Sequence, residues 1–255
     1  MRDKTLVEVV RKLLLALPFA AVAATPTVAK ELVIPPVAYT KIVTHAATPN
    51  GFIPKGWRLQ SRAAGDLNGD GLEDVALVLH DADPKNVLDN RGNIGPDSFD
   101  TNPSILVVAF ASRGGGYDLV LESHTLAARP IYPNGQDPLD PNGEQPGGIA
   151  IKRGTFQVTL GYFSSAGGWS MGRDTFTFRF RDKACELIGY DSIDIERNSG
   201  SDEEVSSDYL SHRMKSTSSN VSSDRPAKIV TKTLPARPLL TIERVGDGLE
   251  FDPKQ

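Results

Sequence analysis

The chain has 255 residues and a formal net charge of −4, from 28 basic and 32 acidic side chains. This mildly acidic balance argues against nucleic acid or an anionic membrane as the main partner. The single cysteine, Cys185, excludes an intramolecular disulfide, and we expect it to be a small buried side chain rather than a nucleophile.

Residues 1–24 have the build of a secretory signal peptide. Basic residues precede an apolar run over 13–24, which is shorter than the roughly 20 residues that cross a bilayer. A short membrane anchor or a buried helix is the alternative. We expect cleavage after Ala23 or Ala24, with Ala29 as a further possible site, and a periplasmic or extracellular protein with no membrane insertion afterwards. Cleavage after Ala24 would remove four basic and two acidic residues and move the net charge from −4 to −6.

Prolines interrupt residues 25–54, which we expect to form an extended lead-in with at most a short edge strand. A single β domain is predicted over 55–255. Within it, DVALVL (74–79) and SILVVAF (104–110) are almost continuously apolar and rich in β-branched residues, which indicates strands buried on both faces. YDLVLES follows the second run after a glycine-rich turn, which predicts a hairpin.

Farther along, apolar and polar residues alternate with a period of two. In GTFQVTLGYF (154–163) and in DTFTFRFRD (174–182) the aromatic and aliphatic residues fall on one face of each segment, as in half-buried strands. The short polar break that follows predicts a hairpin with ACELIGYDSIDIE (184–196). We expect the phenylalanines to belong to the core rather than to a ligand-binding stripe.

Several connections interrupt this pattern. Residues 81–103 and 130–148 form long loops, and loops of this length tend to be functional or mobile. The Ser-rich stretch around 198–227 is predicted to be a flexible loop, with DYLSHRMKST (208–217) as an optional edge strand. PLLTIERV (238–245) is the expected last strand.

These elements define the fold class. We expect an all-β, mainly antiparallel protein, with propeller-blade-like or sandwich-like sheets, long loops and few or no helices after residue 24.

The stretch GDLNGDGLED (65–74) carries the clearest chemistry. Its oxygen-bearing residues alternate, as in a loop that turns every second side chain toward one ion, and Gly71 permits the sharp turn. Calcium takes six to eight oxygen ligands, whereas magnesium demands a smaller, near-octahedral set. The predicted calcium ligands are the side chains of Asp66, Asn68, Asp70 and Asp74 and the backbone carbonyl of Leu72.

This spacing agrees with an EF-hand loop only as far as Asp74. Leu77 stands where the bidentate glutamate would be, and an apolar strand follows instead of a helix. Glu73 is expected to point to solvent. The alternative is a plain hairpin turn built on Asn68-Gly69 and Asp70-Gly71, although such a turn gains nothing from three mutually repelling carboxylates.

GDLNGDGLEDVALVL resembles the calcium-binding segment of FG-GAP repeats (integrin-α-like, VCBS-type), in which an acidic loop runs into an apolar strand. Such repeats form β-propeller blades in tandem, whereas this chain has one clear copy. Over residues 55–200, the segments at 56–79, 96–110 and 176–191 are similar to a group of uncharacterised bacterial secreted proteins with one such loop. The resemblance implies a β fold and an exported location, and it implies no established activity.

Two functions are consistent with these features. One is a calcium-stabilised, non-enzymatic domain of the cell envelope that binds a protein or glycan through its long loops. The other is a secreted hydrolase using acids of the 81–103 loop, for which His80, Asp81, Asp83, Asp97 and Asp100 would have to converge in one pocket. The sequence contains no recognised catalytic motif, and we assign no catalytic residue. A lone histidine such as His80 is expected at the surface, and 161–172 is expected to be a hairpin turn with a packed Trp169.

Overall fold

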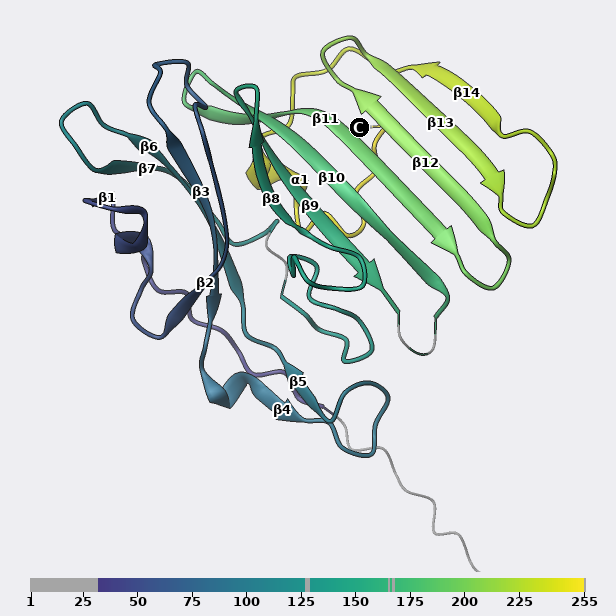
Figure 1. Ribbon diagram of the computed structural model, residues 1–255, viewed down its shortest axis with the longest axis horizontal. Helices are drawn as coiled ribbons and strands as arrows, with labels where there is room; N and C mark the ends of the chain where they lie inside the picture. Colours follow the sequence, from purple (N-terminus) through teal and green to yellow (C-terminus); the bar gives the residue numbers. More distant parts are fainter. Residues whose placement is uncertain (1–31, 127–128, 165, 167, 255) are drawn as a thin grey trace, which may run out of the picture. The chain divides into compact units, whose positions relative to one another are not determined.

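The computed structural model describes residues 32–254 except 127, 128, 165 and 167, so the predicted signal peptide lies outside the described residues. All described residues belong to a single folded unit. Two large antiparallel sheets dominate it (Figure 1).

The first sheet has five strands in the order β1-β7-β6-β3-β2. Its centre is the antiparallel pair of β3 and β6, and the two-residue strand β1 pairs with β7 at the edge. The strands are β1 (His45–Ala46), β2 (Trp57–Gly65), β3 (Asp74–Asp81), β6 (Ser104–Ala111) and β7 (Tyr117–Ser123).

The second sheet has seven strands that follow one another in chain order, each antiparallel to the next. They are β8 (Gly148–Lys152), β9 (Thr155–Phe163), β10 (Ser170–Arg181), β11 (Ala184–Glu196), β12 (Ser201–Asp208), β13 (Arg213–Asn220) and β14 (Lys228–Thr233). Strand β8 lies against β2 of the first sheet, where the side chain of Ile151 contacts Gly65.

The remaining elements are short. A two-stranded hairpin, β4 (Val87–Asp89) with β5 (Ser98–Asp100), occupies part of the predicted loop 81–103. Two 3-10 helices cover Pro49–Phe52 and Pro84–Asn86, and the one α-helix of the described residues, α1, spans Ile242–Val245.

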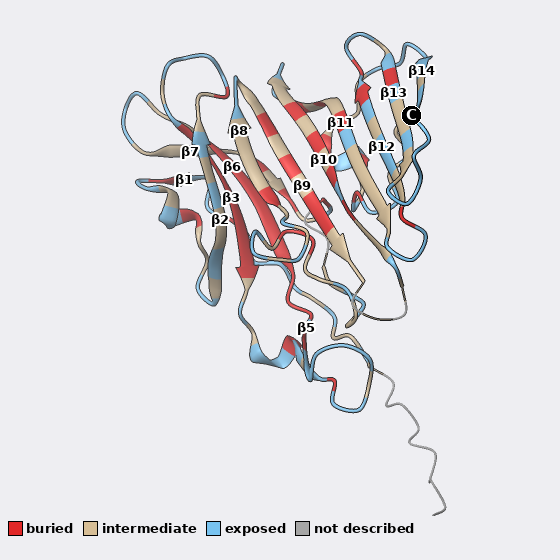
Figure 2. Ribbon diagram, turned by 45° about the vertical axis from the view of Figure 1, so that its right-hand side comes forward, coloured by how far each residue is buried: buried red, intermediate tan, exposed pale blue. Residues whose placement is uncertain are grey.

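Strands β3 and β6 are buried on both faces, as predicted. Figure 2 shows them as continuous buried ribbons, whereas buried and partly exposed residues alternate along β9 and β10. One face of the β3–β6 pair packs against the segment before β2 through Ile42 and Phe52. The other face packs against the phenylalanines of β9 and β10, so these belong to the core, as expected.

The C-terminal segment closes this core. Ile242 and Val245 of α1 are buried in it, and the ring of Phe251 lies 5.2 Å from that of Phe176. The prediction of a last strand over 238–245 is therefore wrong: only Thr241 makes an isolated bridge, with Glu186. A single line of alternating apolar residues fits one helical turn as well as a short strand.

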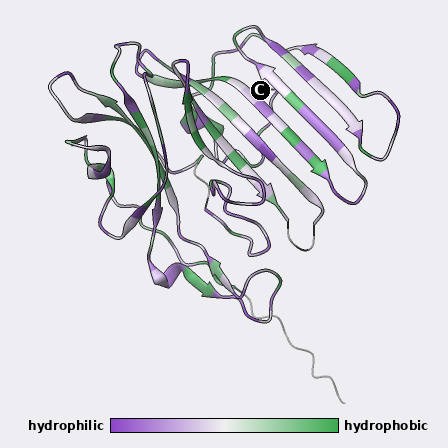
Figure 3. Ribbon diagram, viewed as in Figure 1, coloured by the Kyte–Doolittle hydropathy of each residue, from purple (hydrophilic) through white to green (hydrophobic). Residues whose placement is uncertain are grey.

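The prediction of a flexible loop around 198–227 is also wrong. Strands β12 and β13 occupy most of it, and 209–212, within the stretch predicted as an optional edge strand, is the turn between them. Figure 3 shows β12 and β13 largely white and purple, because serine and charged residues dominate them. Such residues are poor strand formers, but β12 pairs along its whole length with β11.

The architecture confirms an all-β, mainly antiparallel fold. The two sheets pack face to face in a sandwich-like arrangement, and neither closes on itself. Within the described part of the chain, no helix has the length and apolar character needed to cross a membrane.

Candidate functional site

The acidic stretch forms the loop between β2 and β3. The two strands pair up to Gly65 and Asp74, so residues 66–73 protrude from the end of an antiparallel hairpin. Gly69 and Gly71 adopt φ angles of 81° and 83°, a left-handed conformation that glycine reaches without steric cost. The turn thus depends on the two glycines that the sequence places between its acids.

Asp66 organises the start of this loop. Its Oδ1 accepts a 2.7 Å hydrogen bond from the amide of Gly69, and its Oδ2 accepts one of 2.9 Å from the amide of Gly71. The amides of Gly71 and Gly69 stabilise the carboxylate and lower the pKa of Asp66. The carboxylate is therefore charged and fixed in direction at neutral pH.

The next two alternating residues repeat the pattern. Asn68 accepts a 2.9 Å hydrogen bond from the amide of Asp70, and Asp70 accepts one of 2.8 Å from the amide of Leu72. Each side chain thus folds back onto the backbone two residues later, as Asn and Asp do in turns. Both side chains are exposed, and each bonded oxygen keeps a second lone pair.

Asp74 differs from the other predicted ligands because it is completely buried. Its Oδ2 accepts a 2.8 Å hydrogen bond from the amide of Leu67, and its Oδ1 accepts one of 2.9 Å from the amide of Ala111 at the end of β6. The carboxylate therefore joins the loop to the neighbouring strand. Sequence reasoning did not predict this structural role, because Ala111 is distant in the chain.

The charges of the loop act on Asp74. Burial raises its pKa, the amides of Leu67 and Ala111 oppose that rise, and the negative charges of Asp70 and Asp66 add to it. The three carboxylates therefore repel one another, and a cation at the loop would relieve this repulsion.

Among the described residues, no group of three or more His, Cys, Asp or Glu side chains lies close enough to hold a metal ion by itself. An ion at this loop would therefore need the neutral oxygens of Asn68 and Leu72 together with water. This donor set of carboxylate, amide and carbonyl oxygens fits calcium and does not fit zinc or copper, which prefer nitrogen and sulfur.

A pocket of about 430 Å³ borders the loop. Asn68 lines it together with Phe110, Val120 and Phe180, and residues 181–183 supply a charged rim. The rings of Phe110 and Phe180 meet edge to face at 5.0 Å. The pocket lies where the core opens between the two sheets, next to a predicted calcium ligand.

The five residues that a hydrolase would need converge only in part. His80 and Asp100 line one pocket, with His80 Nε2 3.2 Å from Asp100 Oδ2. Asp81, Asp83 and Asp97 do not line that pocket. The first two accept backbone hydrogen bonds within their own turns instead.

His80 is buried to 2 % exposure, so the expectation of a surface histidine is wrong. Its Nδ1 lies 3.1 Å from the hydroxyl of Ser104. Ser104, His80 and Asp100 thus form a line that contains the residue types of a catalytic triad. However, Ser104 is buried and Asp100 is exposed. A serine nucleophile must be accessible to its substrate, and the aspartate of a triad is the buried member.

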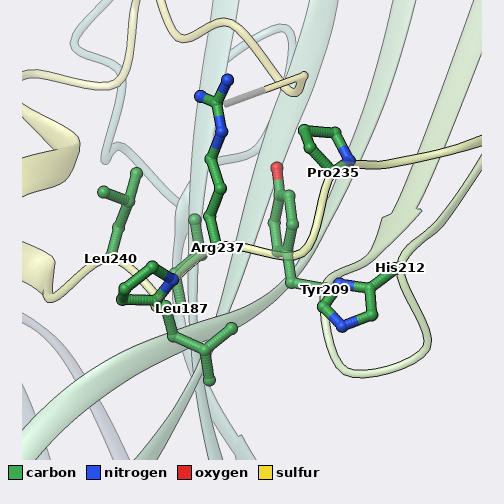
Figure 4. Close-up of a pocket in the computed structure, with 8 residues that line it drawn as sticks. Leu187, Tyr209, His212, Pro235, Arg237 and Leu240 are labelled. Atoms are coloured by element: carbon green, nitrogen blue, oxygen red, sulfur yellow. The ribbon is translucent and has the colours of Figure 1, made fainter.

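Three other features carry little chemistry. Cys185 is buried, as expected, and burial raises the pKa of its thiol to about 12, which makes it unreactive. The turn between β9 and β10 is a hairpin, but Trp169 is 57 % exposed rather than packed, with Arg197 lying over its ring. A hollow between Leu187, Tyr209 and Leu240 (Figure 4) has room for about one water molecule.

No family model, no curated protein and no solved structure matches this chain.

Proposed function

We propose that the protein is an exported, calcium-binding β domain that acts as a binding module rather than as an enzyme. The observation that carries this proposal is the loop between β2 and β3. Its alternating oxygen-bearing side chains are held by backbone amides at the end of the β2–β3 hairpin, and its carboxylates repel one another. The resemblance of this segment to FG-GAP loops supports the same assignment.

Asp66, Asn68, Asp70, Asp74 and the carbonyl of Leu72 would hold the ion, which would draw the three carboxylates closer together than they lie without it. Calcium would supply positive charge where acids crowd together and would fix Asn68 at the border of the adjoining pocket. Because the site depends on neutral oxygens as well as carboxylates, we expect a dissociation constant of about 10⁻⁴–10⁻³ M, as in extracellular calcium modules.

A binding role is favoured over hydrolysis by the geometry around His80. Asp81, Asp83 and Asp97 lie outside the pocket that contains His80 and Asp100. The serine beside His80 faces the interior. The long loops at 81–103 and 130–148 are more suitable for contacting a protein or glycan of the cell envelope, in the periplasm or outside the cell.

Thermal unfolding tests the calcium site. Purified protein treated with EDTA is titrated with calcium, and with magnesium as a comparison. A ligand of the folded state at a hundred times its dissociation constant stabilises by about 2.7 kcal/mol. Asp66→Asn with Asp70→Asn removes two charges and keeps an acceptor oxygen at each position. The matched control, Asp118→Asn with Asp224→Asn, removes two exposed charges elsewhere.

We expect calcium to raise the unfolding midpoint of the wild type and the control, and not that of the loop variant. An equal response of all three proteins, or none, would make 65–74 a plain turn. Export is tested separately by the N-terminus of protein recovered from the cell envelope or medium, which we expect to begin at Ala24, Thr25 or Lys30.

A further inference from the structure

A second, polar pocket lies at the end of the β2–β3 hairpin opposite the acidic loop. Arg58 and Gln60 of β2, His80 of β3 and Asp100 of β5 line one part of it. The loop between β7 and β8 adds Asp137 and Asp140. The two long loops singled out in the sequence therefore meet here, around a cavity of about 340 Å³ that is large enough for a small ligand.

Buried and partly buried hydrogen bonds hold one wall of this pocket. His80 bridges Ser104 and Asp100, and the amide of Asn102 donates a 2.9 Å hydrogen bond to the other oxygen of Asp100. Burial raises the pKa of Asp100, but the hydrogen bonds from Asn102 and His80 outweigh this and lower it overall. Asp100 is therefore a fixed, charged acceptor.

The opposite wall is fixed in the same way. Gln60 Nε2 donates a 2.7 Å hydrogen bond to Asp137. The second carboxylate oxygen of Asp137 accepts a hydrogen bond from the amide of Leu139. Asp140 accepts a hydrogen bond from the amide of Asn142. A ligand would thus meet carboxylates that are already oriented, which reduces the entropy lost on binding.

The lining has an excess of negative charge and of acceptors. Three aspartates face one arginine, Arg58, and that guanidinium forms no ion pair with any residue in the described part of the chain. The Oε1 atom of Gln60 is buried and has no hydrogen-bond partner among the described residues. An acceptor without a donor is costly in a buried position, so the lining of this pocket as a whole is short of N–H donors.

We propose that this pocket binds a cationic nitrogen group, an ammonium or a guanidinium. Such a group brings several N–H donors and the opposite charge, and it forms short, strong hydrogen bonds with carboxylates. The group can come from a small free amine or from a lysine or arginine side chain of another polypeptide. The inference deepens the proposed binding function by naming the chemistry of a ligand, and it does not require calcium.

Isothermal titration calorimetry tests the proposal with four probes: agmatine as a free cation, a capped Gly-Arg-Gly peptide, glutamate as an anion and glucose as a neutral polyol. Two variants change the pocket in opposite directions. Asp140→Asn removes one negative charge and keeps an acceptor for the amide of Asn142, whereas Arg58→Gln removes the competing positive charge. Asp224→Asn, on an exposed loop, is the control.

We expect agmatine, the peptide or both to bind, about tenfold more weakly to Asp140→Asn and more tightly to Arg58→Gln, with the control unchanged. Binding of agmatine indicates a free amine, and binding of the peptide alone indicates a polypeptide side chain. The proposal is overturned if neither cation binds, if glutamate or glucose binds better, or if both pocket variants match the wild type. Calcium titration of the same proteins reports separately on the loop at 66–74.

Discussion

The hydroxyl of Tyr190 donates a 2.8 Å hydrogen bond to Oδ1 of Asp174 across the β10–β11 pair, and both side chains are buried. The pair lies in the main core, where the ring of Tyr190 packs 5.2 Å from that of Phe176. An acid among phenylalanines is stable there only while its oxygens have donors.

Replacing Tyr190 with phenylalanine should therefore destabilise the protein by about 1–3 kcal/mol, because the ring remains and the buried carboxylate loses a donor. Urea unfolding measures the change, with Tyr132→Phe as the control because that side chain is exposed. Equal stability of the wild type and Tyr190→Phe would mean that the hydroxyl contributes nothing.

Asp174 also predicts a pH dependence. Burial raises its pKa, and the hydrogen bonds from Tyr190 and Ser192 only partly oppose this. The folded state therefore binds the proton more tightly than the unfolded state. The resulting stabilisation is complete below the unfolded pKa of about 3.9 and is lost as the pH rises through the folded pKa.

Asp174→Asn removes this titration. We expect its stability, relative to the wild type, to increase between pH 4 and pH 7 in unfolding experiments across that range. Asp224→Asn should show no such trend, because Asp224 is exposed. A constant difference between Asp174→Asn and the wild type at all pH values would contradict the assignment.

Asp74 should stabilise the folded protein even in the absence of a metal ion. Asp74→Ala leaves the buried amides of Leu67 and Ala111 without their acceptor, so we expect a loss of about 2–4 kcal/mol in EDTA. Asp70→Asn keeps its acceptor and lies on the exposed part of the loop, so in EDTA it should change stability little. If the two variants lose equal stability in EDTA, Asp74 has no special structural role.

The backbone conformation of Gly71 should limit which substitutions are tolerated at this position. Its φ of 83° strains any residue with a Cβ, although no atom within 4 Å would obstruct one. We expect Gly71→Ala to cost about 1 kcal/mol in thermal unfolding, and Gly71→Asn to cost less, because asparagine enters this conformation more easily. Equal costs for the two variants would indicate that conformation is not the cause.

Arg129 should hold the 81–103 connection in place. Its guanidinium donates to the carbonyl and hydroxyl of Thr101 and to the carbonyl of Pro35. We expect Arg129→Gln to speed amide hydrogen exchange over residues 98–103, since Thr101 would lose its side-chain support. Arg225→Gln, on an exposed loop, is the control. Unchanged exchange over 98–103 would show that Thr101 does not depend on Arg129.

Sequence patterns predicted the parts of the fold that depend on the local spacing of apolar and polar residues. The double burial of β3 and β6 and the inward phenylalanines of β9 and β10 follow from residue spacing. Strands β12 and β13 could not be predicted in this way, because their serines form strands only through pairing, β12 with the anchored strand β11 and β13 with β12.

The same limit applies to the candidate sites. The oxygen-bearing residues of the acidic loop are close in sequence, so the pattern alone was enough to predict a site there. Arg58, Asp100 and Asp140 come from three separate segments, and only the packing of the long loops brings them together. The burial of His80 likewise depends on Ser104 and the neighbouring strand.

The contribution of the C-terminal segment to the core has a consequence for biosynthesis. The ring of Phe251 packs against that of Phe176, and Val245 is buried in the same core. The strands of both sheets precede these residues in the chain, so during translation the core has all its strands before it has this part of its packing. Folding of the main core therefore cannot be completed until residues 242–251 have been synthesised, and apolar surface that they cover stays exposed until then.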